Sequence, residues 1–372
     1  MASFINRGTK QKPSWQYTIS RMVNGKSKPI RKGGYKSKKE AQVAATEIEN
    51  KLSKGISIST KLVFIDEYFE RWVHLYKNNV KKGTATHYKN TLRIIRDYFP
   101  NIHLQQINKS DYQEFINDFG KTRARETVKK INTQIRACVK DAIDEGIIHI
   151  DFTRNVVLSG SNGKRDEEKY LNYEDSQLLL NTLYKNLGYD RLVHFIILLA
   201  LTSGMRFAEL IGLTRKDFDF FNNTITVNKT WGYLPSTEQG IKTTKTANSN
   251  RVIKMDIRTM KTFRELFDRT PENITQLIFY NPSSKYKVYS NTGVNKALKK
   301  LQESLGFADT ISIHGLRHTH ASVLLYKGVS IQYISERLGH SDIDTTLKKY
   351  THMIKELRKQ DEEKAIKIFE AM

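Results

Sequence analysis

The sequence has almost no cysteine and no long apolar run. Its one cysteine among 372 residues, Cys138, excludes internal disulfides and metal sites built from several thiolates. Cys138 lies in a helical stretch and is expected to be a core residue in a reducing cytoplasm. The best apolar run, Phe195 to Leu201, is too short to cross a bilayer and indicates a buried helix. The N-terminus, MASFINRGTKQK, has no apolar signal-peptide core.

Acidic residues are also scarce, with 39 Asp and Glu against 62 Lys and Arg and a net charge of +23. So large an excess destabilises a compact fold by self-repulsion, and a polyanionic partner is the default explanation. Membrane surfaces are the rival polyanion to nucleic acid, but no segment is long enough to span a bilayer. With 38% hydrophobic and 27% charged residues the chain is globular, and its length predicts two or three domains.

The first sixty residues concentrate the positive charge, with thirteen Lys and Arg against three Glu. Trp15, Tyr17 and Ile19 alternate with polar residues, which predicts a strand. Asn24-Gly25 marks a hairpin turn, and residues 28–32 form the expected return strand. The sequence from Ser37 to Glu40 is a capping box that opens a helix through about residue 51. The segment therefore predicts a small basic sheet backed by one helix.

Two interpretations of this basic unit are open. The lysine-rich surface is either simply solvated or a β-ribbon that enters a DNA groove, and the coincidence of charge and fold favours DNA. The side chains predicted to contact DNA are Trp15, Tyr17, Arg21, Lys26, Lys28, Arg31 and Lys32.

Two polar linkers divide the remainder. SKGISIST (53–60) precedes a helical segment that runs to about residue 155, with expected helices at 109–119 and 124–145. SGSNGKRDEEK (159–169) precedes a part that mixes helices with a strand-rich insert at 218–255. We predict an α+β multidomain chain: a three-stranded sheet plus helix (1–55), an all-α domain (56–160), and a mainly α domain with a small antiparallel sheet (161–372).

The stretch TSGMRFAELIGL (202–213) places Arg206 and Glu209 on one face near the start of a helix. Taken alone, this spacing favours an ordinary surface ion pair. The functional alternative is an arginine fork for phosphate, steadied by the carboxylate behind it.

A second stretch, IHGLRHTHAS (313–322), gathers three histidines and an arginine. His314 and Arg317 lie three residues apart at a helix start, where free N–H groups and the helix dipole favour an anion. Zinc would need a third ligand and carboxylate or carbonyl groups that hydrogen-bond to its ligands. Arg317, Lys327 and Arg337 would instead repel a cation, so metal binding is disfavoured. His318 and His320 are expected to have structural or phosphate-adjacent roles.

In RLGHSDIDTTLKKYTH (337–352), His340 stands just before a helix N-terminus and Tyr350 follows ten residues later. A tyrosine beside lysines is usually a surface or core aromatic, and it becomes a nucleophile only with positive charge or a base nearby. In GIKTTKTANSNRVIKM (240–255) we expect a hairpin with its turn at 247–250 and Lys245 near the tip. A solvated lysine is the simpler interpretation of this stretch.

Taken together in this order, these stretches resemble the tyrosine recombinase (phage integrase) family. Its set of Arg, Lys, His-x-x-Arg, His and Tyr is matched at all six positions. The residues are Arg206, Lys245 (with Lys242 in reserve), His314, Arg317, His340 and Tyr350. The motifs cover roughly residues 170–360. The helical domain is similar in kind to the family's core-binding domain. The N-terminal unit resembles the arm-type DNA-binding domain of integrases from Gram-positive phages and conjugative transposons.

The resemblance implies a site-specific DNA recombinase of a mobile element that works without metal, ATP or other cofactor through a 3′-phosphotyrosine on Tyr350. It implies a homotetramer on core- and arm-type attachment sites in duplex DNA at the bacterial nucleoid, with an excisionase and a host DNA-bending protein as further partners. The tail after Tyr350 has helical spacing and is expected to dock on a neighbouring protomer. The rivals are a Xer-type resolvase, a type IB topoisomerase-like enzyme, and a non-catalytic DNA-binding regulator. An acidic-triad transposase would need clustered carboxylates, and the basic residues of these motifs argue against that class of enzyme.

Overall fold

The computed structural model describes residues 2–9, 11–23, 26–53, 62–163, 165–189, 191–232, 240–243, 249–340, 342–344, 346–347, 362, 366–367 and 370. The chain divides into two compact units, residues 1–163 and 164–372. The architecture is the predicted one: a three-stranded antiparallel sheet with a helix, a helical part, and a mainly helical part with small antiparallel sheets. Among the described helices, none has both the length and the apolar character that crossing a membrane requires.

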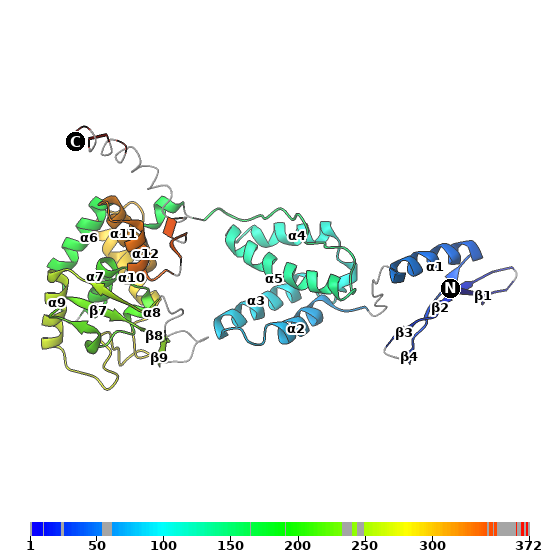
Figure 1. The fold of residues 1–372 in the computed structure, drawn as a ribbon, viewed down its shortest axis with the longest axis horizontal. Helices are drawn as coiled ribbons and strands as arrows, with labels where there is room; N and C mark the ends of the chain where they lie inside the picture. Colours follow the sequence, from blue (N-terminus) through cyan, green and yellow to red (C-terminus); the bar gives the residue numbers. More distant parts are fainter. Residues whose placement is uncertain are drawn as a thin grey trace. The chain divides into compact units, whose positions relative to one another are not determined.

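The N-terminal sheet has the strand order β1 (Ala2–Asn6), β2 (Trp15–Ile19) and β5 (Ile30–Tyr35). Helix α1 (Lys38–Ser53) contacts all three strands (Figure 1). The predicted strand at β2 is confirmed, but the bounds of the return strand are wrong. Pairing with β2 begins at Ile30, because Pro29 has no N–H to donate. A short ribbon of β3 (Met22–Val23) and β4 (Lys26–Ser27) precedes it, and the Asn24-Gly25 turn lies outside the described residues.

Helix α1 begins where the capping-box signature predicted, with the Ser37 half of the box formed and Glu40 bonded to the residue before Ser37. The Glu40 N–H donates to Ser37 Oγ at 3.2 Å, and the Lys36 N–H donates to the Glu40 carboxylate at 2.9 Å. The helix buries Ala45 against Tyr17 and Ile19 of β2. One face of the sheet is therefore the core of this small domain.

The helical part of the first unit consists of α2 (Ile65–Tyr76), α3 (Lys82–Tyr98), α4 (Lys109–Gly120) and α5 (Arg125–Asp144), with a short 3-10 turn at Leu104–Gln106. The helices expected at 109–119 and 124–145 are confirmed. Their apolar faces form one core that includes Trp72, Ile95 and Phe115. Cys138 is 3% exposed in this core, as predicted, and its burial raises the pKa of the thiol.

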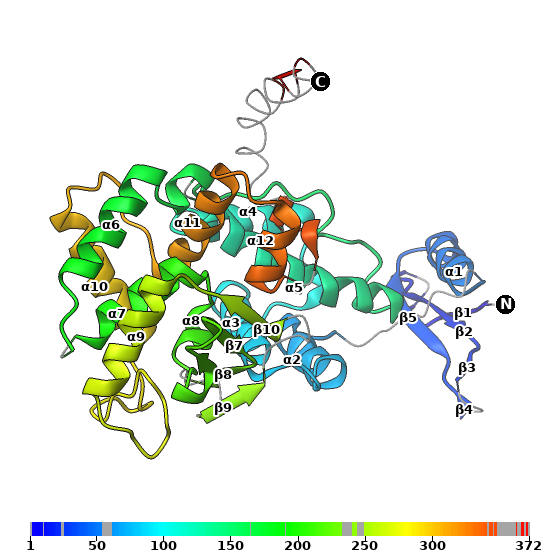
Figure 2. The same ribbon diagram turned by 60° about the vertical axis from the view of Figure 1, so that its left-hand side comes forward.

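The second unit is built around α7 (Leu192–Ser203), whose residues Phe195 to Leu201 are all buried, as their apolar run predicted. Helices α6 (Tyr173–Lys185), α9 (Ile257–Arg269), α10 (Asn291–Ser304) and α11 (Ile313–Tyr326) surround it (Figure 2). The remaining helices are α8 (Phe207–Leu210) and α12 (Ile331–Leu338), with 3-10 turns at Asp166–Lys169 and Arg215–Asp217.

The strand-rich insert forms two small antiparallel sheets. One has the order β10 (Arg251–Lys254), β7 (Thr224–Val227) and β6 (Phe218–Asp219), and the other pairs β8 (Lys229–Gly232) with β9 (Gly240–Thr243). The predicted hairpin between the segments of β9 and β10 is therefore wrong. Pairing β10 with β7 puts Ile253 opposite Ile225 in the core, whereas Ile241 of β9 is 59% exposed and has no core contact to gain.

Candidate active site

Arg206 and Glu209 form the contact that their spacing predicted. Helix α7 ends at Gly204, whose φ of 68° is left-handed, and the chain then starts α8 with Arg206 as its N-cap residue. The Arg206 Nη1 donates to Glu209 Oε1 at 2.8 Å, and the Arg206 backbone N–H donates to Oε2 at 2.9 Å. Because Glu209 is 2% exposed while the Arg206 side chain is 37% exposed, this pair is not an ordinary surface pair.

The Glu209 carboxylate is held in its charged form. Burial alone would raise its pKa, but the charge and hydrogen bonds of Arg251, followed by those of Arg206, lower the pKa below its ordinary value. Arg251 comes from β10, and its Nη2 donates to Glu209 Oε2 at 2.9 Å. Arg251 was not among the residues predicted from the sequence.

Arg317 reaches the same region from α11. Its Nη1 donates to the Gly204 carbonyl at 2.7 Å and its Nη2 donates to the Leu338 carbonyl at 2.7 Å, with the residue 3% exposed. The Arg206 Nη2 donates to the next carbonyl, that of Gly339, at 3.0 Å. The two arginines thus converge on the turn that ends α12.

His340 follows this turn directly. Gly339 adopts a left-handed φ of 67° and terminates α12, and the half-buried His340 comes next. His340 Nδ1 lies 2.7 Å from Thr346 Oγ1, and its backbone N–H donates to Ser335 at 3.1 Å. Thr346 is fully buried, so the hydrogen bond fixes the orientation of the His340 ring. Arg206, Arg317 and His340 are therefore brought together by tertiary structure.

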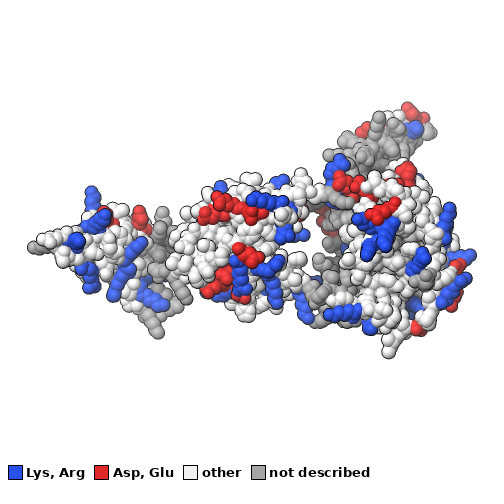
Figure 3. All heavy atoms as spheres, turned by 180° about the vertical axis from the view of Figure 1, so that it is seen from behind, with Lys and Arg blue, Asp and Glu red and all other residues white. Residues whose placement is uncertain are grey.

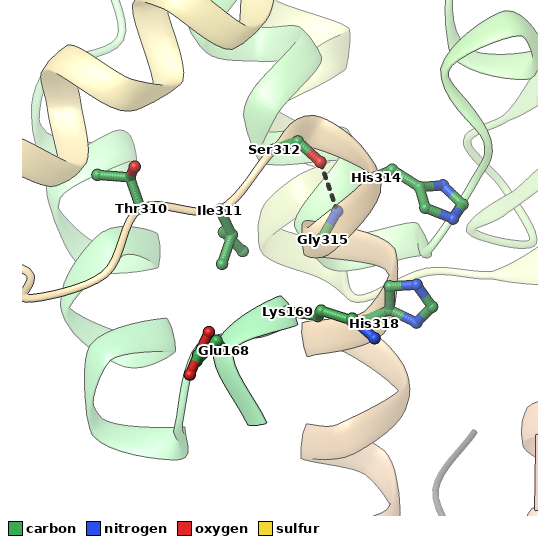
Figure 4. Close-up of a pocket in the computed structure, with 8 residues that line it drawn as sticks. All are labelled: Glu168, Lys169, Thr310, Ile311, Ser312, His314, Gly315 and His318. Carbon is green, nitrogen blue, oxygen red and sulfur yellow. Dashed lines mark hydrogen bonds between the residues drawn. The ribbon is translucent and has the colours of Figure 1, made fainter. Parts of the chain in front are cut away.

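His314 is exposed in the first turn of α11, where Ser312 Oγ accepts from the Gly315 N–H at 3.3 Å. Its ring lies edge-on to that of His318, with centroids 4.9 Å apart. Figure 4 shows both rings on the same side of the helix beside Lys169, at a cavity of about 310 Å³. Within the described residues, no three His, Cys, Asp or Glu side chains are grouped so that they could hold a metal ion.

His320, the third histidine of this stretch, has a structural position. It is 7% exposed, its Nδ1 lies 2.8 Å from the Leu201 carbonyl, and Arg337 Nε donates to its Nε2 at 2.9 Å. Burial, together with the charge of Arg337, lowers the pKa of His320 to about 3. The ring is therefore neutral and joins α11, α12 and the end of α7.

Two predicted residues, Lys245 and Tyr350, lie outside the described residues, as does most of the C-terminal tail. The reserve lysine, Lys242, is half-buried on β9, opposite Thr230 of β8.

The structure corrects one of the DNA contacts predicted for the N-terminal sheet, that of Tyr17. Tyr17 is 2% exposed under α1, and Trp15, two residues earlier on the same face, has its ring 5.9 Å from Lys38 Nζ of that helix. The Tyr17 side chain is thus a core residue and not a DNA contact. The error arose because the apolar half of the alternating pattern faces the helix.

The open face of this sheet carries different residues. Arg31 is exposed and lies opposite Thr18, so both side chains are on the face away from α1, as is Gln16. The alternation in the sequence places Gln16 and Thr18 on this open face, although neither was among the predicted DNA contacts. Lys28 and Lys32 are exposed and Arg21 is half-buried, while the side chain of Lys26 lies outside the described set. Lys and Arg outnumber Asp and Glu on the visible face of this domain (Figure 3).

Three family models match the sequence. The model described as Phage integrase family matches residues 169–356, the phage integrase N-terminal SAM-like domain matches 64–120, and the Arm DNA-binding domain matches 4–52. The chain belongs to the phage integrase family. It is a tyrosine recombinase, an enzyme that breaks and rejoins DNA strands.

The relatives agree with this membership. The integrase of Staphylococcus phage L54a is 26% identical over 346 residues, which cover 87% of this chain and 97% of that protein. The integrase of transposon Tn1549, solved with transposon right end DNA, has a similar fold with a TM-score of 0.66. The two proteins are 19% identical, and the matched region covers 80% of this chain and 99% of the Tn1549 integrase chain. The lambda integrase tetramer bound to a Holliday junction has a TM-score of 0.57 at 16% identity. The matched region covers 90% of this chain and 94% of the lambda integrase chain.

Proposed function

We propose that this recombinase is the integrase of a mobile element and that Arg206, Lys245, His314, Arg317, His340 and Tyr350 form its active site. The observation that carries the proposal is the convergence of Arg206 and Arg317 on the consecutive carbonyls of Gly339 and Leu338, next to His340. Residues from three separate segments meet there around a site with positive charge. Such a cluster, fixed in advance, suits the charge that develops on a phosphate in transfer.

The reaction assigned to these residues is a phosphoryl transfer between two hydroxyl groups. The Tyr350 oxygen forms a bond to phosphorus, the phenol proton leaves with help from the histidines, and the bond to the 5′-oxygen breaks. Lys245 gives a proton to that 5′-oxygen, and Arg206 and Arg317 hold the non-bridging oxygens. The 3′-phosphotyrosine retains the energy of the phosphodiester bond, so that religation needs no ATP.

The substrate is duplex DNA, bound through three domains at residues 1–55, 56–160 and 161–372. The matches to a SAM-like domain and an arm DNA-binding domain support this division. The open face of the N-terminal sheet, with Gln16, Thr18 and Arg31, would enter the groove of an arm-type site. A homotetramer on core sites is the assembly, by analogy with the lambda integrase tetramer bound to a Holliday junction, and the tail after Tyr350 would dock between protomers. An excisionase and a host DNA-bending protein would complete the complex at the nucleoid.

A suicide duplex tests the assignment of the nucleophile. The duplex carries the junction between the element and its flanking DNA, with a nick that lets the 5′-hydroxyl fragment diffuse away after cleavage. Wild-type protein should form a covalent adduct in EDTA, and Tyr350→Phe should bind the same DNA without forming the adduct. An adduct in the Phe variant would overturn the assignment. A wild-type protein that binds but never forms an adduct would favour the non-catalytic regulator.

A further inference from the structure

The side chain of Arg251 connects several parts of the candidate active site. Its Nη2 donates to Glu209 Oε2 at 2.9 Å and its Nη1 approaches Oε1 at 3.4 Å. Arg206 bonds to the same two oxygens, Nη1 to Oε1 and its backbone N–H to Oε2. Each oxygen of Glu209 thus accepts one hydrogen bond from each arginine. The position of Arg206 therefore depends on a carboxylate that Arg251 holds from the other side.

The charges of these three groups explain why a second arginine is needed. Glu209 is 2% exposed and the Arg251 side chain is 7% exposed, so their charges are poorly screened by water. Glu209 with Arg206 alone would be a neutral pair with little attraction for a phosphate. With Arg251, the cluster keeps one net positive charge, and the half-exposed Arg206 is the member that can present it.

Arg251 also binds the turn that precedes His340. Its Nε donates to the Arg337 carbonyl at 2.7 Å, and its Nη1 donates to the Ser249 carbonyl at 2.9 Å. Gly339 packs directly on the guanidinium, since a Cβ there would lie 3.0 Å from Arg251 Nη1. The same side chain thus connects Glu209, the end of α12 and the start of β10.

We infer that Arg251 is a positioning residue of the recombination reaction. It keeps Arg206 oriented through Glu209, leaves the cluster with a net positive charge, and holds the turn that carries His340. This inference rests on the proposed roles of Arg206 and His340. The hydrogen bonds of Arg251 go to Glu209, Ser249 and Arg337, which are not among the six residues proposed to act on DNA. Its effect should therefore appear in the rate of adduct formation at saturating DNA and not in DNA affinity.

The experiment measures single-turnover adduct formation by the full chain on the suicide duplex, beside the dissociation constant for the same DNA. Arg251→Met removes the charge and all donors at similar length, and we expect a rate about 100-fold lower with an affinity within about 3-fold. Arg251→Lys keeps the charge but loses the planar guanidinium that bonds to both Glu209 oxygens, and it should cleave faster than Arg251→Met but slower than the wild type. The matched control is Arg215→Met. Arg215 is another half-buried arginine of this unit, bonded to the carbonyls of Phe267 and Thr270, and its variant should cleave at the wild-type rate.

A double variant separates positioning from loss of fold. In Arg251→Met the remaining Glu209 neutralises Arg206, so adding Glu209→Gln should raise the rate about 10-fold above that of Arg251→Met. A double variant slower than, or equal to, Arg251→Met would overturn the inference, as would wild-type cleavage by folded Arg251→Met. If the wild-type protein forms no adduct on Tyr350, the proposed function fails instead, and the two failures are distinguishable.

Discussion

Arg206 and Arg317 donate to the carbonyl oxygens of consecutive residues, Gly339 at 3.0 Å and Leu338 at 2.7 Å. Guanidinium groups held by backbone carbonyls have little freedom to rotate, so the reaction proposed for them would not need to order them first. The two arginines differ in burial, however. Arg317 is 3% exposed, whereas the Arg206 side chain is 37% exposed.

This difference predicts distinct outcomes for Arg317→Lys and Arg206→Lys. A lysine at 317 cannot span the Gly204 and Leu338 carbonyls, so both the cleavage rate and the stability should fall, the latter by about 1–3 kcal/mol. A lysine at 206 should lower the rate about 100-fold with a stability change below about 1 kcal/mol. Chemical denaturation and single-turnover cleavage measure the two effects. Equal loss of stability in both variants would contradict the role given to burial.

Gly204→Ala should impair both fold and site. At a φ of 68°, an added Cβ would lie 2.7 Å from His320 Cδ2 and 2.9 Å from Leu338 Cδ2. Gly328 is the matched control, because its φ of 80° is also left-handed but no atom lies within 4 Å of a Cβ. We expect Gly328→Ala to cost about 1–2 kcal/mol from the backbone alone, and Gly204→Ala at least about 1 kcal/mol more, with slower cleavage. Equal unfolding free energies of the two variants would contradict this prediction, because they would show that His320 and Leu338 can move aside without cost.

Thr346→Val tests whether the orientation of His340 matters. Valine keeps the shape of the buried threonine but removes the hydroxyl that lies 2.7 Å from His340 Nδ1. Adduct formation should slow about 10-fold, which is less than the roughly 100-fold or more that a positioned acid–base group contributes, because the His340 ring itself is retained. Thr346→Ser retains the hydroxyl and should cleave several-fold faster than the Val variant. If the Ser and Val variants cleave equally fast, the hydrogen bond does not position the ring.

The burial of His320 predicts that the free energy of unfolding decreases as the pH falls. Its pKa is lowered from 6.5 to about 3 by burial and by Arg337, so the unfolded chain binds the extra proton first as the pH falls. Its contribution is fully present above pH 6.5 and declines below it, by about 1.4 kcal/mol per pH unit. His320→Gln can still accept from Arg337 but cannot titrate, so its unfolding free energy should depend less on pH between 6.5 and 4.5. The same slope in both proteins would contradict this account.

Arg31→Ala and Tyr17→Ala should act differently on the arm domain. Arg31 is exposed on the open face, so its removal should weaken binding to arm-type DNA with little effect on thermal unfolding. Tyr17 is buried beneath α1, and its removal should destabilise the domain by about 3 kcal/mol or more. Gel-shift titrations and thermal unfolding of the full chain measure both. Unchanged arm-site affinity in Arg31→Ala would place the DNA contact elsewhere.

Sequence reasoning succeeded where the deciding interactions are local. Three predictions of this kind are the Ser37 cap of α1, helices α4 and α5, and the contact between Arg206 and Glu209. Each depends on residues within one or two helical turns of one another. Spacing along a helix determines which of these side chains share a face. The alternation in β2 was local too, and the error there was to assign its apolar face to DNA instead of to α1.

The failures concern partners far apart in the chain. The segment of β10 looked like the return strand of β9, but it pairs with β7, and this pairing buries Ile253 beside Ile225. Arg251 was missed for the same reason, since nothing near it in the sequence indicates that its partner is Glu209.

The sequence by itself therefore determined the residue types, their order and the local elements that carry them. The six motif positions were predicted because their order and spacing resemble the residue set of the tyrosine recombinase family, and that set suits phosphoryl transfer without metal. Only the tertiary structure decided which of these groups meet, which arginine is buried, and that Arg251 compensates the charge of Glu209. Burial and long-range hydrogen bonding depend on how separate helices and strands pack, and that packing is not encoded in any single stretch.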